Sequence, residues 1–257
     1  MTYTIISKDC ADSKDLQKVI SKKLQLKEDE NNPDIIIVIG GDGTILRAIH
    51  QYSDILDNVI IFGIHTGHLG FLTNYKKDDV NDIIDLLNNS DKIQVEEHSL
   101  LEYKFESNDG IKTGIALNEV TITSAPNMIT LDVVVDEKIL ETFRGGGLCI
   151  STPLGSTGYN KSLGGAVIDH NIPCIQVTEI AGINSNSYKT LQSSLLLSVD
   201  RKILIKGNSE FGLFTYDNKS HRVDSFKSLE VKLSNRKVRL AYNSEINFVN
   251  RVNKSFL

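Results

Sequence analysis

The order of apolar and polar positions divides the chain into two halves of different character. In the first hundred residues, short apolar runs alternate with segments whose apolar residues recur every three or four positions. Runs of the first kind predict strands, and segments of the second kind predict amphipathic helices. The predicted strands are residues 2–7, 35–39 and 59–62. Because strand and helix alternate, we expect parallel strand pairing with right-handed crossovers, in a Rossmann-like open α/β sheet over residues 1–98.

Three segments of this half have helical spacing, with apolar positions in Leu16–Leu24, Ile45–Ile49 and Val80–Leu87. Asp12 or Ser13 is the expected N-cap of the first helix, because both side chains can accept a hydrogen bond from a free backbone N–H. Asp78 and Asp79 are expected to begin the third helix. The run Ile35–Ile39 consists only of β-branched residues, as is typical of a strand that is buried on both faces.

The second half of the chain has a different pattern, in which one short β-rich stretch follows another. These stretches are residues 101–106, 113–123, 130–135 and 139–143, and further short strands are predicted between 195 and 240. Asp136-Glu137 has the composition of a hairpin turn. This succession predicts an all-β sandwich domain over residues 99–240.

Composition and charge narrow the classes of function. The chain has 257 residues, of which 40% are hydrophobic and 24% charged, as in ordinary globular proteins. Its formal net charge of -5 and the lack of a basic run argue against nucleic acid as a partner. No apolar stretch approaches the ~20 residues of a membrane span, and no signal peptide is visible. The three cysteines have no Cys-x-x-Cys spacing, so we expect a cytoplasmic protein without disulfides or a zinc site.

The segment Gly40-Gly41-Asp42-Gly43-Thr44 lies between a predicted strand and a predicted helix. Glycines at the carboxyl end of such a strand let the backbone approach a ligand, and a helix N-terminus there favours phosphate. A carboxylate repels phosphate, so we expect Asp42 either to bind Mg²⁺ or to accept a proton from a hydroxyl group that is phosphorylated. The alternative is a tight turn in which Asp42 is the helix N-cap. No Gly-Lys-Ser/Thr follows, so the loop is not a Walker A motif.

Two further motifs follow other predicted strands. Gly63-Ile64-His65-Thr66-Gly67-His68-Leu69-Gly70-Phe71 again combines glycines with a strand end and predicts a loop of close approach. Its two histidines alone are weak evidence for a metal site, and we predict none. Asn118-Glu119 interrupts an apolar run, either as a polar pair that binds the hydroxyl groups of a sugar or as an edge or turn.

The fourth motif runs from Arg144 to Ser162 and is rich in glycine, serine and threonine. We expect that so many small and hydroxylated residues do not form a packed core. They suit a backbone that wraps around a ligand, with Tyr159 available for stacking or hydrogen bonding. A flexible linker is the alternative, but apolar residues anchor the segment at Leu148–Ile150 and Ala166–Ile168.

Together and in this order, the four motifs resemble those of the NAD kinase family, whose members phosphorylate NAD to NADP. The matching segments are Gly40–Thr44, Gly63–Phe71, Asn118-Glu119 and Arg144–Ser162. The second and fourth are similar to the branch from low-GC Gram-positive bacteria. Lipid kinases of the diacylglycerol type and phosphofructokinases have a loop like the first. The Asn-Glu pair and the Ser-Thr-Pro-x-Gly-Ser-Thr-x-Tyr segment separate the NAD kinases from both.

The resemblance implies an activity and a set of site residues. Asp42 would be the general base that takes the proton of the adenosine-ribose 2′-hydroxyl of NAD, while ATP with Mg²⁺ supplies the phosphoryl group. The phosphate loop would be Gly40, Gly41, Gly43 and Thr44. The residues implied in NAD binding are Asp42, Gly43, Asn118, Glu119, Arg144, Gly146, Thr157, Gly158, Tyr159, Asn160, Lys161, Ser162, Ala181 and Asn218.

The resemblance also implies how these residues are grouped and how the chain assembles. Asn118 and Glu119 would bind the ribose and adenine portions of NAD. The walls of the pocket on the adenine and nicotinamide sides would be Thr157, Gly158, Tyr159 and Ser162, with Ala181 nearby. Arg144 and Gly146 would approach the substrate from a neighbouring subunit of a homodimer or homotetramer. The family fold is an α/β domain followed by a β-sandwich, with the last residues, about 241–257, returning to the first domain.

Two positions depart from the family pattern. Gly145-Gly146-Gly147 stands where the family has Gly-Asp-Gly, and Gly158 stands where alanine is usual. Loss of a carboxylate that contacts substrate weakens binding by ~1.5–3 kcal/mol, or about ten- to a hundredfold. The alternative to an active kinase is therefore an NAD(P)-binding protein with little or no kinase activity.

Overall fold

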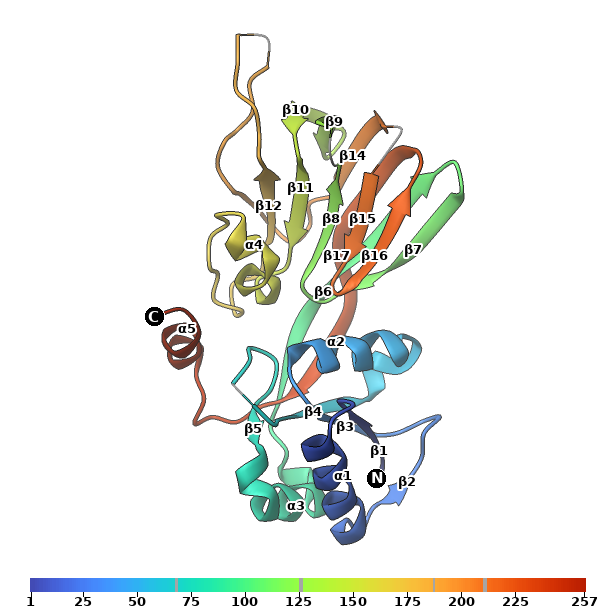
Figure 1. The fold of residues 1–257 in the computed structure, drawn as a ribbon, viewed down its shortest axis with the longest axis vertical. Helices are drawn as coiled ribbons and strands as arrows, with labels where there is room; N and C mark the ends of the chain where they lie inside the picture. The colour runs from blue at the N-terminus through green and yellow to red at the C-terminus, as the bar shows by residue number, and fades with distance from the viewer. Residues whose placement is uncertain (68, 125–126, 187, 210–211) are drawn as a thin grey trace. The chain divides into compact units, whose positions relative to one another are not determined.

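The computed structural model describes residues 1–67, 69–124, 127–186, 188–209 and 212–257. The chain divides into two compact units, one formed by Met1–His98 with Arg236–Leu257 and the other by Ser99–Asn235. Two long strands, β6 (Val95–Ser107) and β17 (Phe226–Ala241), each run from one unit into the other (Figure 1). None of the described helices is long and apolar enough to cross a membrane.

The first unit is built on an open parallel sheet, as the alternation of strand and helix predicts. Its strands are β1 (Thr2–Ser7), β2 (Lys27–Glu28), β3 (Ile35–Ile39), β4 (Ile60–His65) and β5 (Tyr75–Lys76). The order is β17-β4-β3-β1-β2, with β5 also paired to β4, and all of these pairs are parallel. All five residues of β3 are buried, which confirms that this strand is covered on both faces.

Helices cover the two faces of this sheet (Figure 1). They are α1 (Ala11–Lys23), α2 (Asp42–Gln51) and α3 (Val80–Asn88), and the chain ends in α5 (Phe248–Phe256). Ile20 of α1 and Ile83 of α3 share one hydrophobic cluster with the odd-numbered residues of β3. The 3-10 turns of this unit are Ser53–Asn58, Lys77–Asp79 and Ser90–Lys92.

The start of α1 differs from the prediction. The N-cap is Cys10, in an extended backbone conformation, and neither Asp12 nor Ser13. Ser13 is buried inside the first turn, and its hydroxyl accepts a hydrogen bond from the Cys10 thiol at 3.2 Å. The third helix begins as predicted, with Asp79 as the N-cap of α3.

The second unit is a β-sandwich, which confirms the predicted fold class. One layer contains β6, β7 (Gly110–Ala116), β9 (Ile129–Val135), β10 (Lys138–Gly145), β14 (Ile203–Ser209) and β17. The other has the order β13 (Leu195–Leu197), β12 (Ile175–Ile180), β11 (Gly147–Ser151), β8 (Glu119–Thr123), β15 (Gly212–Tyr216) and β16 (Lys219–Val223). The core lies between the layers, where Leu131 and Phe143 of the first belong to the same cluster as Val120 and Ile150 of the second.

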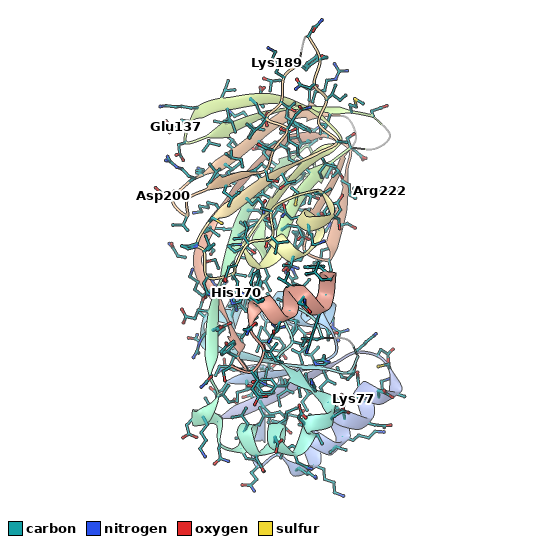
Figure 2. All side chains as sticks on the ribbon, turned by 90° about the vertical axis from the view of Figure 1, so that its left-hand side faces the viewer. Lys77, Glu137, His170, Lys189, Asp200 and Arg222 are labelled. Carbon is teal, nitrogen blue, oxygen red and sulfur yellow. The ribbon has the colours of Figure 1, made fainter. Side chains whose placement is uncertain are left out.

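Asp136 and Glu137 form the predicted hairpin turn between β9 and β10. Both have positive φ, 46° and 67°, as two-residue hairpin loops require. The Asp136 side chain accepts a hydrogen bond from Lys202 N and pairs with Arg201. Figure 2 shows Glu137 and Asp200 on the same side of this unit.

The predicted strand 113–123 is wrong as a single element. The structure has two strands there, and Leu117-Asn118 lies between them. The N–H groups of Leu117 and Asn118 donate to the carboxylate of Asp217, at 3.0 and 2.7 Å, instead of to a strand partner. A side chain from a distant hairpin therefore breaks the apolar run in two.

Candidate functional site

The loop Gly40–Thr44 connects the end of β3 to the start of α2. Gly41 is the N-cap and Asp42 is the first helical residue, so the alternative that Asp42 is the N-cap is wrong. A Cβ on Gly40 would lie 2.3 Å from Thr44 Oγ1, so a larger residue there would displace the side chain of Thr44. Apart from neighbouring residues of the chain and the backbone of α2, no described atom lies within 4 Å of a Cβ built on Gly41 or Gly43, so there is space for a ligand beside these two glycines.

The carboxylate of Asp42 is held by the second glycine-rich motif. Oδ2 accepts a hydrogen bond from Phe71 N at 2.8 Å, and Oδ1 accepts one from Leu72 N at 3.0 Å. Because β3 and β4 are parallel neighbours, the loops that follow them emerge at the same edge of the sheet. A Cβ on Gly70 would lie 2.1 Å from Asp42 Oδ1, so the glycine there makes room for the carboxylate.

The structure describes one of the two histidines of this motif. His65 is buried, and its Nδ1 lies 2.8 Å from the carbonyl oxygen of Gly67. His68 lies outside the described residues. In the part of the chain that the structure describes, no group of three or more His, Cys, Asp or Glu side chains is placed to hold a metal ion.

A cavity of about 330 Å³ lies in the second unit beside β8 and the β15–β16 turn. Three of the predicted site residues line it: Glu119, Tyr159 and Asn218. The rest of its lining is mainly polar, with Thr121, Thr123, Thr215, Asp217, Lys219 and Ser220 beside Leu213. The cavity thus offers many hydrogen-bonding groups, which suits a hydroxylated ligand.

Asn118-Glu119 is fixed beside this cavity by hydrogen bonds from the fourth motif. Thr152 Oγ1 donates to Leu117 O at 2.6 Å, and Thr152 N donates to Asn118 O at 2.9 Å. A Cβ on Gly155 would lie 2.0 Å from Asn118 O, so this glycine lets the two segments approach closely. The serine, threonine and glycine residues of the motif therefore pack against the backbone before β8.

The expectation that this segment does not form a packed core is wrong. Its buried side chains include Ser151, Thr152, Ser156 and Asn160. Three of these side chains have hydrogen-bond partners inside the protein. Thr152 binds the backbone of residues 117 and 118, as described above. Ser156 Oγ accepts a hydrogen bond from Ile168 N at 2.9 Å, and Asn160 Oδ1 accepts one from the Thr178 hydroxyl at 2.7 Å. Hydroxyl and amide groups can be buried at low cost when each is hydrogen-bonded, and the segment meets this condition at those positions.

Glu119 is the most unusual ionisable group of the site. Its side chain is only 7% exposed, and Oε2 has no hydrogen-bond partner among the described residues. Burial, followed by the negative charge of Asp217, raises the pKa of Glu119 to about 8, although a backbone hydrogen bond from Tyr159 opposes this. At neutral pH the group is therefore mostly a neutral acid, which can both donate to and accept from a ligand hydroxyl. A Cβ on Gly158 would lie 3.1 Å from Oε2, so glycine leaves this oxygen more accessible.

The other predicted residues of the segment 157–162 lie around the 3-10 turn Leu154–Thr157 and the short helix α4 (Tyr159–Ser162). Thr157 Oγ1 donates to Leu154 O at 3.0 Å. Tyr159 and Ser162 are exposed, and Lys161 is half-buried.

Arg144, Gly146 and Ala181 form a separate group. Strand pairing aligns Glu119 with Ser151 at one end of β8 and β11, and Thr123 with Gly147 at the other. Gly146 precedes that second end, which is roughly 13 Å from Glu119 at the usual rise of a strand. A Cβ on Gly146 would lie 3.6 Å from Ala181 Cβ and 3.1 Å from Ile180 O, and Arg144 lies over the ring of Tyr188 at 4.7 Å.

The sequence resemblance indicated Asp217-Asn218 as a pair that contacts substrate. In the structure, Asp217 holds the turn before Glu119 and raises the pKa of Glu119, a role that the sequence did not predict. One further functional candidate, Arg251, was not predicted from the sequence. Arg251 is buried in α5 and donates to the loop that follows Gly70. Its position between Phe248 and Phe256, on the apolar stripe of a C-terminal helix, is the signal that could have identified it.

Comparison with known proteins gives consistent matches over both units. A family model described as "ATP-NAD kinase N-terminal domain" matches residues 3–93, and one described as "ATP-NAD kinase C-terminal domain" matches residues 117–241. The NAD kinase of Limosilactobacillus reuteri subsp. reuteri is 38% identical, and that of Staphylococcus aureus strain JH9 is 41% identical. Each alignment covers 100% of this chain and 98% of the relative.

Two solved structures have a similar fold. Yeast NADH kinase complexed with NADH has a TM-score of 0.86 at 19% identity, covering 99% of this chain and 86% of that one. An NAD kinase from Archaeoglobus fulgidus in complex with ATP has a TM-score of 0.79 at 24% identity, covering 99% of both chains.

The buried carboxyl group of Glu119 predicts a pH-dependent stability. Its pKa is raised from 4.5 to about 8, so between these values the unfolded chain releases the proton and the folded chain retains it. Folding stability due to this group is therefore present below pH 4.5 and is lost as the pH rises through about 8. Glu119→Gln removes the ionisation. We therefore expect the difference in Tm, variant minus wild type, to increase by about 2–4 °C or more when the pH is raised from 5 to 8.5.

Thermal unfolding followed by circular dichroism at the two pH values measures this difference. Glu137→Gln, at the exposed turn of the same unit, is the matched control and should show no such change. An equal Tm difference for Glu119→Gln at both pH values would contradict the raised pKa.

Proposed function

The chain belongs to the NAD kinase family, and from this premise we propose how its residues carry out the reaction. The enzyme is an ATP-dependent NAD kinase, which transfers the γ-phosphoryl group of ATP to the adenosine-ribose 2′-hydroxyl of NAD to make NADP. The alternative of an NAD(P)-binding protein with little kinase activity, raised by Gly146, is not supported, since the relatives that match the whole chain are named NAD kinases.

Asp42 is the general base of this proposal. The observation that carries it is the carboxylate held at the start of α2 by the N–H groups of Phe71 and Leu72. A carboxylate oxygen has two acceptor positions, so each oxygen keeps one for the ribose hydroxyl. As the 2′ oxygen forms its bond to the γ-phosphorus, the bond from that phosphorus to the bridging oxygen of ADP breaks, and the hydroxyl proton passes to Asp42.

The loop Gly40–Thr44 is the proposed binding site of the ATP phosphates. The open backbone at Gly41 and Gly43 and the N-terminus of α2 support this, because both favour a negatively charged group. The described residues do not form a metal site of three or more side-chain ligands. Mg²⁺, when bound with ATP, would be held mainly by the phosphates and by water, as is common for this ion, and would neutralise part of their negative charge.

The cavity beside Glu119 is the proposed site of NAD recognition. The unpartnered Oε2 of Glu119 supports this, because a buried oxygen of this kind gains a hydrogen bond when a hydroxyl group enters. Asn118 and Asn218 add amide groups, and Tyr159 adds an exposed ring for stacking. Thr157, Gly158, Lys161 and Ser162 are proposed to form the remaining wall of the site, and Asn160 supports this wall from inside the protein through its bond to Thr178.

Arg144, Gly146 and Ala181 are proposed to reach the substrate of a neighbouring subunit. Their position at the other end of the β8–β11 pair supports this. Self-association is supported by β10, an edge strand on which Ile139 and Leu140 are 69% and 46% exposed. We also propose a cytoplasmic location, in which the three cysteines remain the free thiols seen in the structure.

Replacement of the base should remove turnover and leave binding intact. Asp42→Asn keeps the size of the side chain but cannot accept the proton, so we expect kcat to fall by about 10²–10⁴-fold, with Kd for NAD changed by no more than about threefold. NADP formation gives kcat, and calorimetry gives Kd. A variant with the full rate of wild type would show that Asp42 is not the base.

Displacing the same carboxylate by steric overlap should have a similar but smaller effect. Gly70→Ala places a methyl group 2.1 Å from the present position of Asp42 Oδ1, so the side chain must move. We expect kcat to fall by about 10–100-fold, as is usual for a misplacement near 1 Å. Gly67→Ala in the same loop meets no described atom within 4 Å and should keep the wild-type kcat. Equal rates for the two variants would contradict the assignment.

The exposed edge strand predicts a homodimer or homotetramer. Light scattering should give a mass of two or four times 28.5 kDa, and Leu140→Lys should shift the protein toward smaller species. A wild-type protein that is monomeric throughout the micromolar range would contradict this part of the proposal.

A further inference from the structure

Arg251 binds three oxygens of one short loop. It is only 5% exposed, and its guanidinium group donates to Gly70 O, to Thr73 O at 3.1 Å and to Asn74 Oδ1. All three acceptors are uncharged. A planar guanidinium with five N–H groups can join several acceptors at fixed directions, which an ammonium group cannot do. Arg251 therefore sets the path of the chain from Gly70 to Asn74.

The helix that carries Arg251 makes a second contact with the same loop. In α5, Asn247 is the N-cap, and its side chain accepts a hydrogen bond from Asn250 N at 2.8 Å. One turn beyond Arg251, the ring of Phe256 stacks on that of Phe71, with the centroids 5.4 Å apart. The contacts of α5 thus reach the residue whose N–H group binds Asp42.

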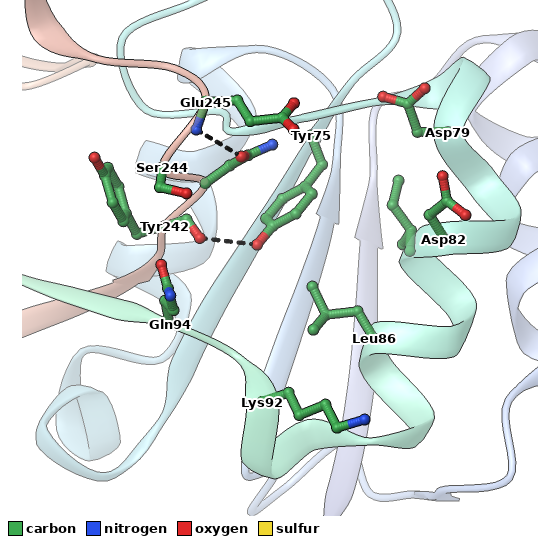
Figure 3. A pocket seen from close by; sticks show the side chains of 11 residues that line it. Tyr75, Asp79, Asp82, Leu86, Lys92, Gln94, Tyr242, Ser244 and Glu245 are labelled. Atoms are coloured by element: carbon green, nitrogen blue, oxygen red, sulfur yellow. Dashed lines mark hydrogen bonds between the residues drawn. The ribbon is translucent and has the colours of Figure 1, made fainter.

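The chain segment before α5 fixes the far end of the loop. Asn74 Nδ2 donates to Ala241 O at 2.7 Å, and the Tyr75 hydroxyl donates to Tyr242 O at 3.0 Å. Figure 3 shows this second bond, with the side chain of Tyr75 directed at the backbone of Tyr242. Asn74 N also donates to Gly63 O of β4 at 3.2 Å. The loop is therefore held at both ends by residues 241–256, and Arg251 makes three of these hydrogen bonds.

Electrostatics also connects Arg251 to the site. Burial lowers the pKa of Arg251, while the charges of Asp42, Glu96 and Tyr242 act in the opposite direction. Burial of a cation is costly unless its N–H groups are hydrogen-bonded. A buried arginine is therefore favourable at position 251 only because of the groups to which it donates. What it binds is the loop that supplies Phe71 N and Leu72 N to Asp42.

We propose that Arg251 is a positioning residue of the kinase reaction, which holds the loop Gly70–Asn74 so that its N–H groups keep the Asp42 carboxylate in place. This inference rests on the proposed role of Asp42 as the base. Arg251 acts through the loop and has no contact with substrate in this proposal. Its loss should therefore lower kcat while NAD binding is preserved.

Two substitutions of Arg251 and one matched control test this. Arg251→Gln removes the fork of donors, and we expect kcat to fall about 10–100-fold with KM for NAD within about threefold of wild type. Arg251→Lys keeps the charge but cannot reach all three acceptors, so its kcat should lie between those of wild type and Arg251→Gln. Arg236→Gln is the control, because Arg236 is also an arginine of the first unit, and its guanidinium group binds Asp57 and Ser53 O. It should keep the wild-type kcat.

Rates are expressed per folded site, counted by calorimetric titration with NAD, so that partial misfolding does not imitate a loss of kcat. If Arg251→Gln does not fold, Arg251→Lys decides the question. A wild-type kcat per site in the variant that folds would overturn the proposal, and so would a loss confined to KM.

A double-mutant cycle with Asp42→Asn separates positioning from general structural damage. If Arg251 acts through Asp42, Arg251→Gln should reduce the residual rate of Asp42→Asn by no more than about twofold. The reason is that the rate losses caused by two substitutions are not additive when one residue acts through the other. Fully additive losses would overturn the proposal even when both single variants are slow. The outcome is distinct from a failure of the proposed function, in which Asp42→Asn itself would retain the wild-type rate.

Discussion

The hydrogen bonds from Phe71 N and Leu72 N to the Asp42 carboxylate are the contact on which the first unit depends for its chemistry. Hydrogen bonds to a charged group contribute about 1.5–3 kcal/mol, enough to select one rotamer of Asp42 among three. Both partners are delivered by the sheet, because β3 and β4 are parallel neighbours and their following loops emerge at one edge. Gly70 then admits the carboxylate, and Gly41 and Gly43 leave the approach to it open.

The second unit buries the carboxyl group of Glu119, one oxygen of which has no hydrogen-bond partner among the described residues. Asp217 and Thr152 hold Glu119 at the start of β8 through the two residues before it. The carboxylate of Asp217 accepts hydrogen bonds from the N–H groups of residues 117 and 118, and the Thr152 hydroxyl donates to the carbonyl oxygen of residue 117. Burial and the nearby Asp217 keep the pKa of Glu119 near 8, so the acid is neutral when the cavity is empty. In the proposed function, a ligand hydroxyl supplies the missing hydrogen bond, so the cost of burying Glu119 favours ligands that carry a hydroxyl group over those that lack one.

Local signals in the sequence were sufficient for the fold class. The β-branched run Ile35–Ile39 predicted a doubly covered strand, and Asp136-Glu137 predicted a turn whose φ values confirm it. Where a distant side chain intervenes, the sequence predicted less. Asp217 breaks the run 113–123 from a hundred residues away, and the hydroxyl-rich segment around Ser156 is buried because partners such as Ile168 satisfy it. Arg251 lies 177 residues from Asn74, so no local pattern indicated that it binds this loop.

The distance from Asp42 to the adenosine-ribose 2′ oxygen, in a crystal structure of the enzyme with NAD, measures directly whether the carboxylate serves as the base. We expect one carboxylate oxygen within about 2.6–3.2 Å of that oxygen, the range of a hydrogen bond. The bonds from Phe71 N and Leu72 N should persist in the same structure. A 2′ oxygen hydrogen-bonded to another group, with the Asp42 carboxylate beyond reach even through one water molecule, would contradict the mechanism.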